Sequence, residues 1–152
     1  MNFGRTLKFI SAVSLFSMIK IKYKKPANNI LRVFKEKYPN ATFVCWMQTD
    51  ALDWNVHFNW KQKEYSALFN NKGRWLESTT LVLFDFLPSK IKIHFIKNYN
   101  IQSIRKIYEI HTPSSKLYKI EWCYEVSYLQ FFYDTKGNLI QKIEIECSSL
   151  IN

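Results

Sequence analysis

Two stretches of similar sequence decide the fold: "LFNNKGRWLES" at residues 68–78 and "FYDTKGNLIQK" at residues 132–142. In each, an aromatic residue is followed by Asn or Asp, another polar residue, Lys-Gly, and then a segment suited to a strand. The chain has only three glycines. Glycine readily adopts the positive φ that closes short hairpin loops. We therefore expect Gly73 and Gly137 to close the same hairpin turn in two copies of one structural unit.

The sequence around these turns repeats as one helix followed by four strands, over residues 26–84 and 87–147. Apolar residues at helical spacing predict helices at 26–38 and 87–99, and Pro39 ends the first of them. Alternating apolar and polar residues, separated by short polar turns, predict the strands. The expected strands are 41–48, 53–60, 63–69 and 74–82 in the first copy, and 103–110, 116–125, 127–134 and 138–146 in the second.

Consecutive strands with short connections favour antiparallel pairing, and each copy would bury one sheet face under its helix. Joining the two copies edge to edge protects an edge strand that would otherwise be exposed. The sequence therefore predicts an α+β fold with one antiparallel sheet of about eight strands and two helices on one face. Most of the five tryptophans lie in phase with the buried face, which favours core packing over a carbohydrate-binding platform.

The net charge of +10 is concentrated at the N-terminus. Residues 1–26 hold six basic residues and no acidic one, which leaves 16 basic against 12 acidic residues in the remainder. That remainder is an ordinary surface balance, so we expect no nucleic-acid partner. At 152 residues and 47% hydrophobic composition, the chain has the size and apolar content of one folded domain.

Residues 1–25 have the outline of an export signal, with a basic start and the apolar segment "FISAVSLFSMI" at 9–19. The segment lacks a small-residue cleavage site and runs directly into lysines. We therefore expect either a degenerate signal or an uncleaved N-terminal arm, followed by a single domain at 26–152. Residues 9–25 could also make weak contact with an anionic membrane surface.

Catalytic chemistry finds little support in the sequence. The three histidines share no motif, the three cysteines have no metal-binding spacing, and three glycines cannot form a phosphate-binding loop. Three cysteines allow at most one internal disulfide. The sequence does not decide whether Cys45 and Cys123 form it. We expect no catalytic residues, no metal and no cofactor.

The sheet face without helices is the expected binding surface, because it combines apolar and aromatic residues with polar ones. The residues assigned to it are Phe43, Met47, His57, Leu68, Tyr128 and Phe132. The alternatives are that the N-terminal arm, loops or a second copy of the chain cover these residues. If the assignment of alternating residues to the two sheet faces is wrong by one residue, all of these side chains lie on the other face.

Taken together, the segments "FKEKYPNATFVCW", "YSALFNNKGRWLES", "LPSKIKIHFIKNY", "KLYKIEWCYE" and "LQFFYDTKGNLI" resemble the PepSY-like family described as beta-lactamase-inhibitor-like, over residues 27–146. The sequence departs from the family pattern at Asn70, where Asp is usual, and at Asn100, where Pro ends the helix. The resemblance implies tandem helix-plus-sheet repeats, usually exported from Bacteroidetes-type bacteria. Beta-lactamase inhibitor protein shares this fold and binds its target on the concave sheet surface.

These observations together predict a periplasmic or secreted, non-enzymatic domain that recognises a protein or peptide on its open sheet face. An inhibitor-like role follows from the resemblance alone. The alternative is a structural domain that associates with itself, as a homodimer, and has no external ligand.

Overall fold

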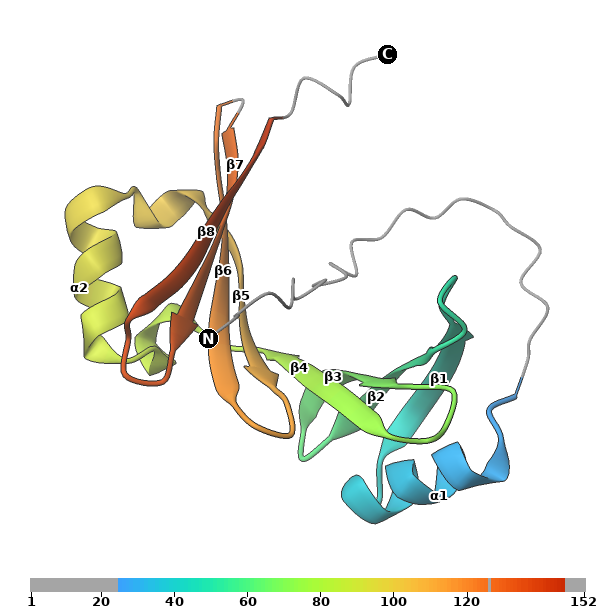
Figure 1. The fold of residues 1–152 in the computed structure, drawn as a ribbon. Coiled ribbons are helices and arrows are strands. Elements are labelled where there is room, and N and C mark those ends of the chain that lie inside the picture. Colours follow the sequence, from blue (N-terminus) through green and yellow to red (C-terminus); the bar gives the residue numbers. More distant parts are fainter. Residues whose placement is uncertain (1–24, 126, 147–152) are drawn as a thin grey trace, which may run out of the picture.

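In the computed structural model, which describes residues 25–125 and 127–146, all eight strands form one antiparallel sheet. The strands lie in chain order from β1 to β8, and two α-helices pack on one face (Figure 1). The predicted fold class, with about eight strands and two helices, is confirmed. β4 pairs with β5, which joins the two repeats edge to edge as expected.

The first repeat consists of one helix and four strands around its own hydrophobic core. Ile30, Phe34 and Tyr38 from the helical segment pack against residues of β2 and β3, among them Val56 and Phe69. Trp46, Trp60 and Trp75 are partly buried against the same core. The elements are α1 (Asn28–Lys37), β1 (Thr42–Gln48), β2 (Trp54–Trp60), β3 (Lys63–Phe69) and β4 (Trp75–Leu81).

The second repeat has the same order and a second core. Ile91 and Phe95 of its α-helix pack against Ile120 of β6 and Phe131 of β7. Two short 3-10 helices, which the sequence analysis did not predict, flank the α-helix. The elements are η1 (Phe84–Phe86), α2 (Ser89–Asn98), η2 (Ile101–Ser103), β5 (Ile104–His111), β6 (Lys116–Tyr124), β7 (Ser127–Asp134) and β8 (Leu139–Glu146).

Both helices end in the same way, at a tyrosine. The N–H of Tyr38 donates to the carbonyl of Phe34 at 2.8 Å, and the N–H of Tyr99 donates to the carbonyl of Phe95 at 2.8 Å. A tryptophan then fixes the residue that follows each tyrosine. Trp60 Nε1 donates to the carbonyl of Pro39 at 3.0 Å.

Trp122 Nε1 likewise donates to the carbonyl of Asn100 at 2.9 Å. Both Pro and Asn have a backbone carbonyl, so the presence of Asn100 in place of the family's usual Pro leaves this contact unchanged.

The two glycine turns have matching geometry. Gly73 has φ +88° and Gly137 has φ +79°, both in the left-handed region that favours glycine. Asn70 Oδ1 accepts hydrogen bonds from backbone N–H groups within the first turn, and Asp134 Oδ1 does so in the second. Asn70, which stands where the family usually has Asp, therefore supports the same turn, because both side chains supply the accepting oxygen.

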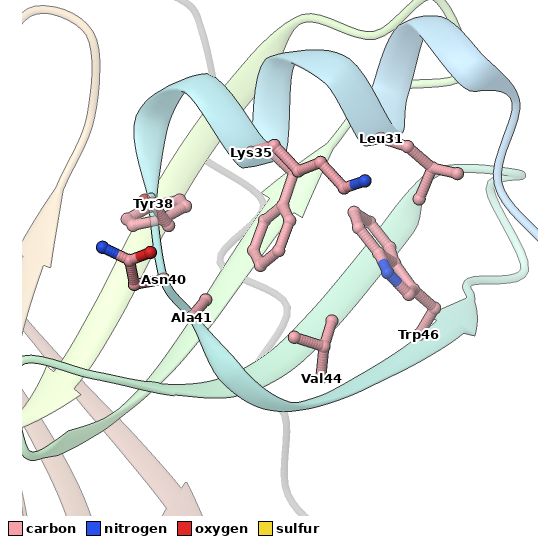
Figure 2. Close-up of a pocket in the computed structure, with 8 residues that line it drawn as sticks. Leu31, Lys35, Tyr38, Asn40, Ala41, Val44 and Trp46 are labelled. Atoms are coloured by element: carbon pink, nitrogen blue, oxygen red, sulfur yellow. The ribbon is translucent and has the colours of Figure 1, made fainter.

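β1 is an edge strand with an irregular start. Its register shifts between Thr42 and Cys45, and Phe43 has φ +52° inside this bulge. A bulky residue with positive φ is uncommon and strained. The bulge lies beside a pocket between α1 and β1 (Figure 2).

Candidate binding face

The face of the sheet opposite the two helices carries the predicted binding residues. Side chains alternate between the two faces of a strand, so neighbours of the core positions project onto this side. Figure 1 shows both helices on the convex side of the bent sheet and no described helix on the concave side. We call this surface the helix-free face. Its residues include Cys45, Met47, Asn55, His57, Asn59, Ser66, Leu68, Glu77, Tyr108, Lys119, Glu121, Cys123, Tyr128, Gln130 and Phe132.

In the first repeat, the structure brings Met47, His57 and Leu68 together on this face. His57 pairs across strands with Ser66, while Met47 and Leu68 both pair with Asn55. Asn55 Nδ2 lies 3.4 Å from His57 Nε2, and the Ser66 hydroxyl donates to Asn55 Oδ1 at 2.9 Å. Burial lowers the pKa of His57 from 6.5, so this imidazole is neutral at pH 7. The cluster of Met47, Asn55, His57, Ser66 and Leu68 is therefore an uncharged, hydrogen-bonding surface with apolar edges.

Phe43, the remaining predicted residue of the first repeat, lies in the β1 bulge. Its side chain is 84% exposed. It is therefore separate from the cluster around His57, at the outer edge of the sheet.

In the second repeat, Tyr128 is half-buried, but Phe132 is only 1% exposed. The expectation that Phe132 is an exposed aromatic residue is therefore wrong. It lies on an inner strand between its cross-strand partners Lys119 and Gln141, whereas Phe43 occupies an edge. A side chain flanked on both sides by neighbouring strands loses solvent contact that an edge residue keeps.

A cluster of charged and aromatic residues occupies the helix-free face of β5, β6 and β7. Lys119 Nζ lies 4.4 Å from the centre of the Tyr108 ring, which is a cation–π contact. The same ammonium lies 2.8 Å from Oε1 of Glu121, with side-chain exposures of 11% and 6% for the pair. Oε1 receives no aligned hydrogen bond from a described residue, so the contact is an ion pair. Gln130 Nε2 donates to the Tyr128 hydroxyl at 3.4 Å.

Burial is the main cause of the pKa shifts of three groups on this face: Tyr108, Tyr128 and Glu77. Burial raises the pKa of Tyr108 to about 12, and the Glu121 carboxylate adds to the shift. Burial also raises the pKa of Tyr128. Burial raises the pKa of Glu77, although the positive charge of Lys119 opposes this shift. Both phenols are therefore neutral hydrogen-bonding groups at pH 7.

Four residues of this site were not predicted from the sequence: Tyr108, Lys119, Gln130 and Glu77. Alternation along the predicted strands could have placed Lys119 and Gln130 beside Glu121 and Tyr128. Glu77 faces this side through its pairing with Leu68 of β3, next to a register shift, and Tyr108 through the pairing of β5 with β4 and β6.

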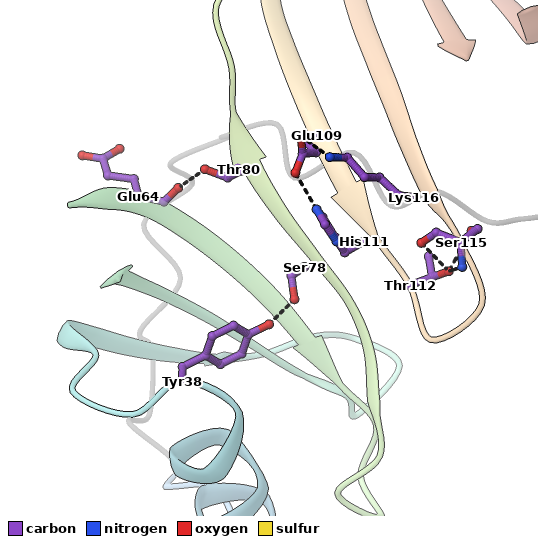
Figure 3. A network of polar contacts seen from close by, with 9 residues as sticks. All are labelled: Tyr38, Glu64, Ser78, Thr80, Glu109, His111, Thr112, Ser115 and Lys116. Carbon is purple, nitrogen blue, oxygen red and sulfur yellow. Dashed lines mark hydrogen bonds and ion pairs between the residues drawn. The ribbon is translucent and has the colours of Figure 1, made fainter. Parts of the chain in front are cut away.

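On the opposite face, a polar seam separates the two hydrophobic cores (Figure 3). His111 Nε2 lies 2.5 Å from Glu109 Oε1, and Lys116 Nζ lies 2.9 Å from Glu109 Oε2. Ser78, the cross-strand partner of His111, shares a hydrogen bond with the Tyr38 hydroxyl. These side-chain contacts lie within each repeat, and the pairing of Ser78 with His111 in the β4–β5 ladder brings the two groups together.

The seam and the helix-free face should respond to pH in opposite ways. Burial alone would raise the pKa of Glu109, but hydrogen bonds from His111 and Lys116 outweigh it and hold that pKa below 4.5. The ionised carboxylate therefore stabilises the fold above pH 4.5, and this contribution is lost as the pH falls through the folded-state value. For Glu77 the sign reverses, because its raised pKa means that ionisation opposes folding at neutral pH.

We expect Glu109→Gln to lower the free energy of unfolding by about 1 kcal/mol at pH 7, since it weakens charge-assisted hydrogen bonds of partly exposed groups. Glu77→Gln should raise the free energy of unfolding. Both differences from wild type should shrink below pH 4.5, because the two carboxyl groups then become protonated. Urea unfolding at pH 7 and at acidic pH measures both, with the exposed Glu64→Gln as the control. Equal effects of the two substitutions at pH 7 would contradict these assignments.

The remaining predictions concern cysteines, metals and the N-terminus. Cys45 and Cys123 are both free thiols. Within residues 25–125 and 127–146, no three His, Cys, Asp or Glu side chains are grouped so as to hold a metal ion. No helix in those ranges has the length and apolar character needed to cross a membrane. Cys147 and the signal-like segment lie outside the described residues.

Solved structures share this architecture. A BLIP-like protein from Bacteroides fragilis is 19% identical, with a TM-score of 0.73, over 82% of this chain and 90% of that chain. A DUF2874 family protein from Bacteroides ovatus is 21% identical, with a TM-score of 0.73, over 85% of this chain and 95% of that chain. A protein from Bacteroides eggerthii, named "putative periplasmic", is 16% identical, with a TM-score of 0.73, over 81% of this chain and 91% of that chain.

The similarity to these solved structures establishes the fold. In a separate sequence comparison, no curated protein matches the chain. The model of the PepSY-like family, which is described as beta-lactamase-inhibitor-like, matches residues 50–141 and so covers more than half of the chain. With two helix-plus-sheet repeats, the chain belongs to this PepSY-like family.

Proposed function

We propose that this protein is a non-enzymatic, exported binding domain that recognises a protein or peptide on its helix-free face. The observation that carries the proposal is the composition of that face. Aromatic residues, an ion pair and neutral hydrogen-bonding groups lie together on a bent sheet surface that no described helix covers. Protein interfaces characteristically combine aromatic anchors with fixed polar groups.

The polar groups of this face are held in place by one another. Lys119 is fixed by both Tyr108 and Glu121, and His57 and Ser66 both contact Asn55. A surface ordered in advance loses less conformational entropy when a partner binds. An enzyme would instead need a nucleophile or an acid–base group poised beside its base. His57 is in contact with Asn55, and His111 with Glu109. Among the described residues, neither imidazole is hydrogen-bonded to a serine or cysteine that could act as a nucleophile.

Export and an inhibitor-like role are supported by the comparisons in different ways. One similar structure is that of a protein named "putative periplasmic", and another is that of a protein named BLIP-like. The first name favours a periplasmic or secreted location. The second is compatible with an inhibitor-like role, although one fold serves many functions.

Quantitative capture from an envelope extract tests the helix-free face. Met47→Glu and Tyr128→Ala alter residues of that face that retain solvent contact. Ile96→Glu alters an exposed residue of α2 on the opposite side of the sheet. We expect a partner identified with the wild-type chain to be lost with the first two variants and retained with the third, and its purified form to reproduce this order in calorimetry. Equal capture by all three variants would contradict the proposal.

Self-association is the second candidate, and the β1 edge favours it. Phe43, Val44 and Met47 are large apolar residues of that edge with substantial solvent exposure. Edge strands with unpaired backbone groups can pair with another chain. Light scattering of the wild-type chain distinguishes the candidates, because a stable dimer weakened by Met47→Glu would favour this alternative.

A further inference from the structure

A pocket of about 400 Å³ lies between α1 and β1, away from the helix-free face (Figure 2). Its walls are mainly apolar: Leu31 and Phe34 come from the helix, while Val44 and Trp46 come from the strand. The Lys35 side chain also lines it. Ligand pockets in proteins commonly begin at about 300 Å³ and are mostly apolar with a few placed polar groups.

The topology explains why the first repeat has this pocket. β1 is the outermost strand of the sheet, so no strand that the structure describes lies along its free edge beside α1. In the second repeat the equivalent strand, β5, is paired with β4 on that side. The bulge at Phe43 further disturbs β1 next to the pocket. Duplication of the unit therefore closed one edge groove and left the other open.

The charges on α1 indicate what the open groove can attract. Arg32 is paired with Glu36 at 2.8 Å, and Lys37 Nζ lies 3.5 Å from the centre of the Trp75 ring. The Lys35 ammonium has no ion pair or hydrogen bond with any residue that the structure describes. Figure 2 shows its side chain extending toward Trp46. An unpaired ammonium beside an apolar pocket is complementary to a carboxylate attached to an alkyl chain.

We propose that this pocket binds medium-chain aliphatic monocarboxylates, with the alkyl chain against Phe34, Val44 and Trp46 and the carboxylate at Lys35. A methylene group fills about the volume of a water molecule, roughly 30 Å³, so the cavity suits a chain on the order of ten carbons. Burial of each methylene contributes about 0.8 kcal/mol, so affinity should increase with chain length until the cavity is filled. Binding here is independent of the helix-free face.

Decanoate, below its micelle concentration, is the probe. Calorimetry on the full chain should show saturable binding that is stronger than that of hexanoate and of decyltrimethylammonium. Lys35→Glu should weaken decanoate binding at least about tenfold, equivalent to about 1.4 kcal/mol. Lys97→Glu, the same charge change on exposed α2, is the matched control and should leave the affinity within about twofold of wild type, because salt screens a distant surface charge.

Location is tested separately, by the NMR signal of the Trp46 indole N–H. This signal should shift with decanoate occupancy, and Val44→Trp should abolish binding by filling the cavity while leaving the thermal unfolding midpoint near the wild-type value. Equal binding of decanoate and decyltrimethylammonium would overturn the proposal. So would equal losses with Lys35→Glu and Lys97→Glu, or a Trp46 signal that does not move.

Discussion

Replacement of Phe95 by alanine is expected to lower the free energy of unfolding by about 3–5 kcal/mol. Phe95 is fully buried at the centre of the second core. Its ring packs edge-on against Phe131, with ring centres 5.0 Å apart, and contacts Tyr99 with centres 5.2 Å apart. Truncation removes these contacts and leaves a cavity that a strand-backed core can fill only in part.

Urea unfolding monitored by circular dichroism measures this loss. Ile96→Ala is the matched control, because the next residue of α2 is 62% exposed and its truncation should change stability by less than about 0.5 kcal/mol. The equivalent change in the first repeat, Phe34→Ala, should be comparably destabilising, since Phe34 is also buried and packs against Phe58 and Trp46. Similar small losses for Phe95→Ala and Ile96→Ala would mean that α2 does not pack as described.

Gly137→Ala is expected to cost about 2–3 kcal/mol, more than the equivalent Gly73→Ala. Both residues have positive φ, where a Cβ atom costs about 1–2 kcal/mol. At Gly137 the new Cβ would also lie 2.8 Å from the Cβ of Lys90, next to the backbone of α2. At Gly73 the closest atom is Nδ2 of Asn29, 2.9 Å away at the end of a side chain that can rotate.

Thermal or urea unfolding of the two alanine variants measures the difference. If Gly137→Ala is no more destabilising than Gly73→Ala, the close approach of the second turn to α2 does not contribute. Lys90→Ala provides a further check, because removing the long side chain, which contacts Asn138, leaves the Cβ in place and so should not rescue Gly137→Ala.

Local sequence patterns predicted most of the fold. The spacing of Ile30 and Phe34, and of Ile91 and Phe95, was sufficient to place both helices, because helical periodicity shows in the sequence. Strands 63–69 and 127–134 were predicted with their observed bounds, since apolar runs and turn residues delimit them. The 3-10 helices were missed, because three-residue elements have no periodicity to detect.

The candidate site was less predictable. Alternation placed His57 and Tyr128 on the helix-free face, but it gave no measure of burial, so Phe132 was expected to be exposed. Tyr108 joined the site only through the register between β4 and β5, which connects segments far apart in the chain. That pairing depends on how the two repeats dock, and no local pattern encodes it.

The sequence by itself determined the duplicated unit, its two glycine turns and the alternation that divides core from surface, because each depends on residues a few positions apart. Only the tertiary structure decided that both turns pack against a helix, that Lys119 lies between Tyr108 and Glu121, and that a pocket opens beside Lys35. These features arise where segments distant in the sequence meet. Their energies therefore depend on distances set by the packing of the whole sheet.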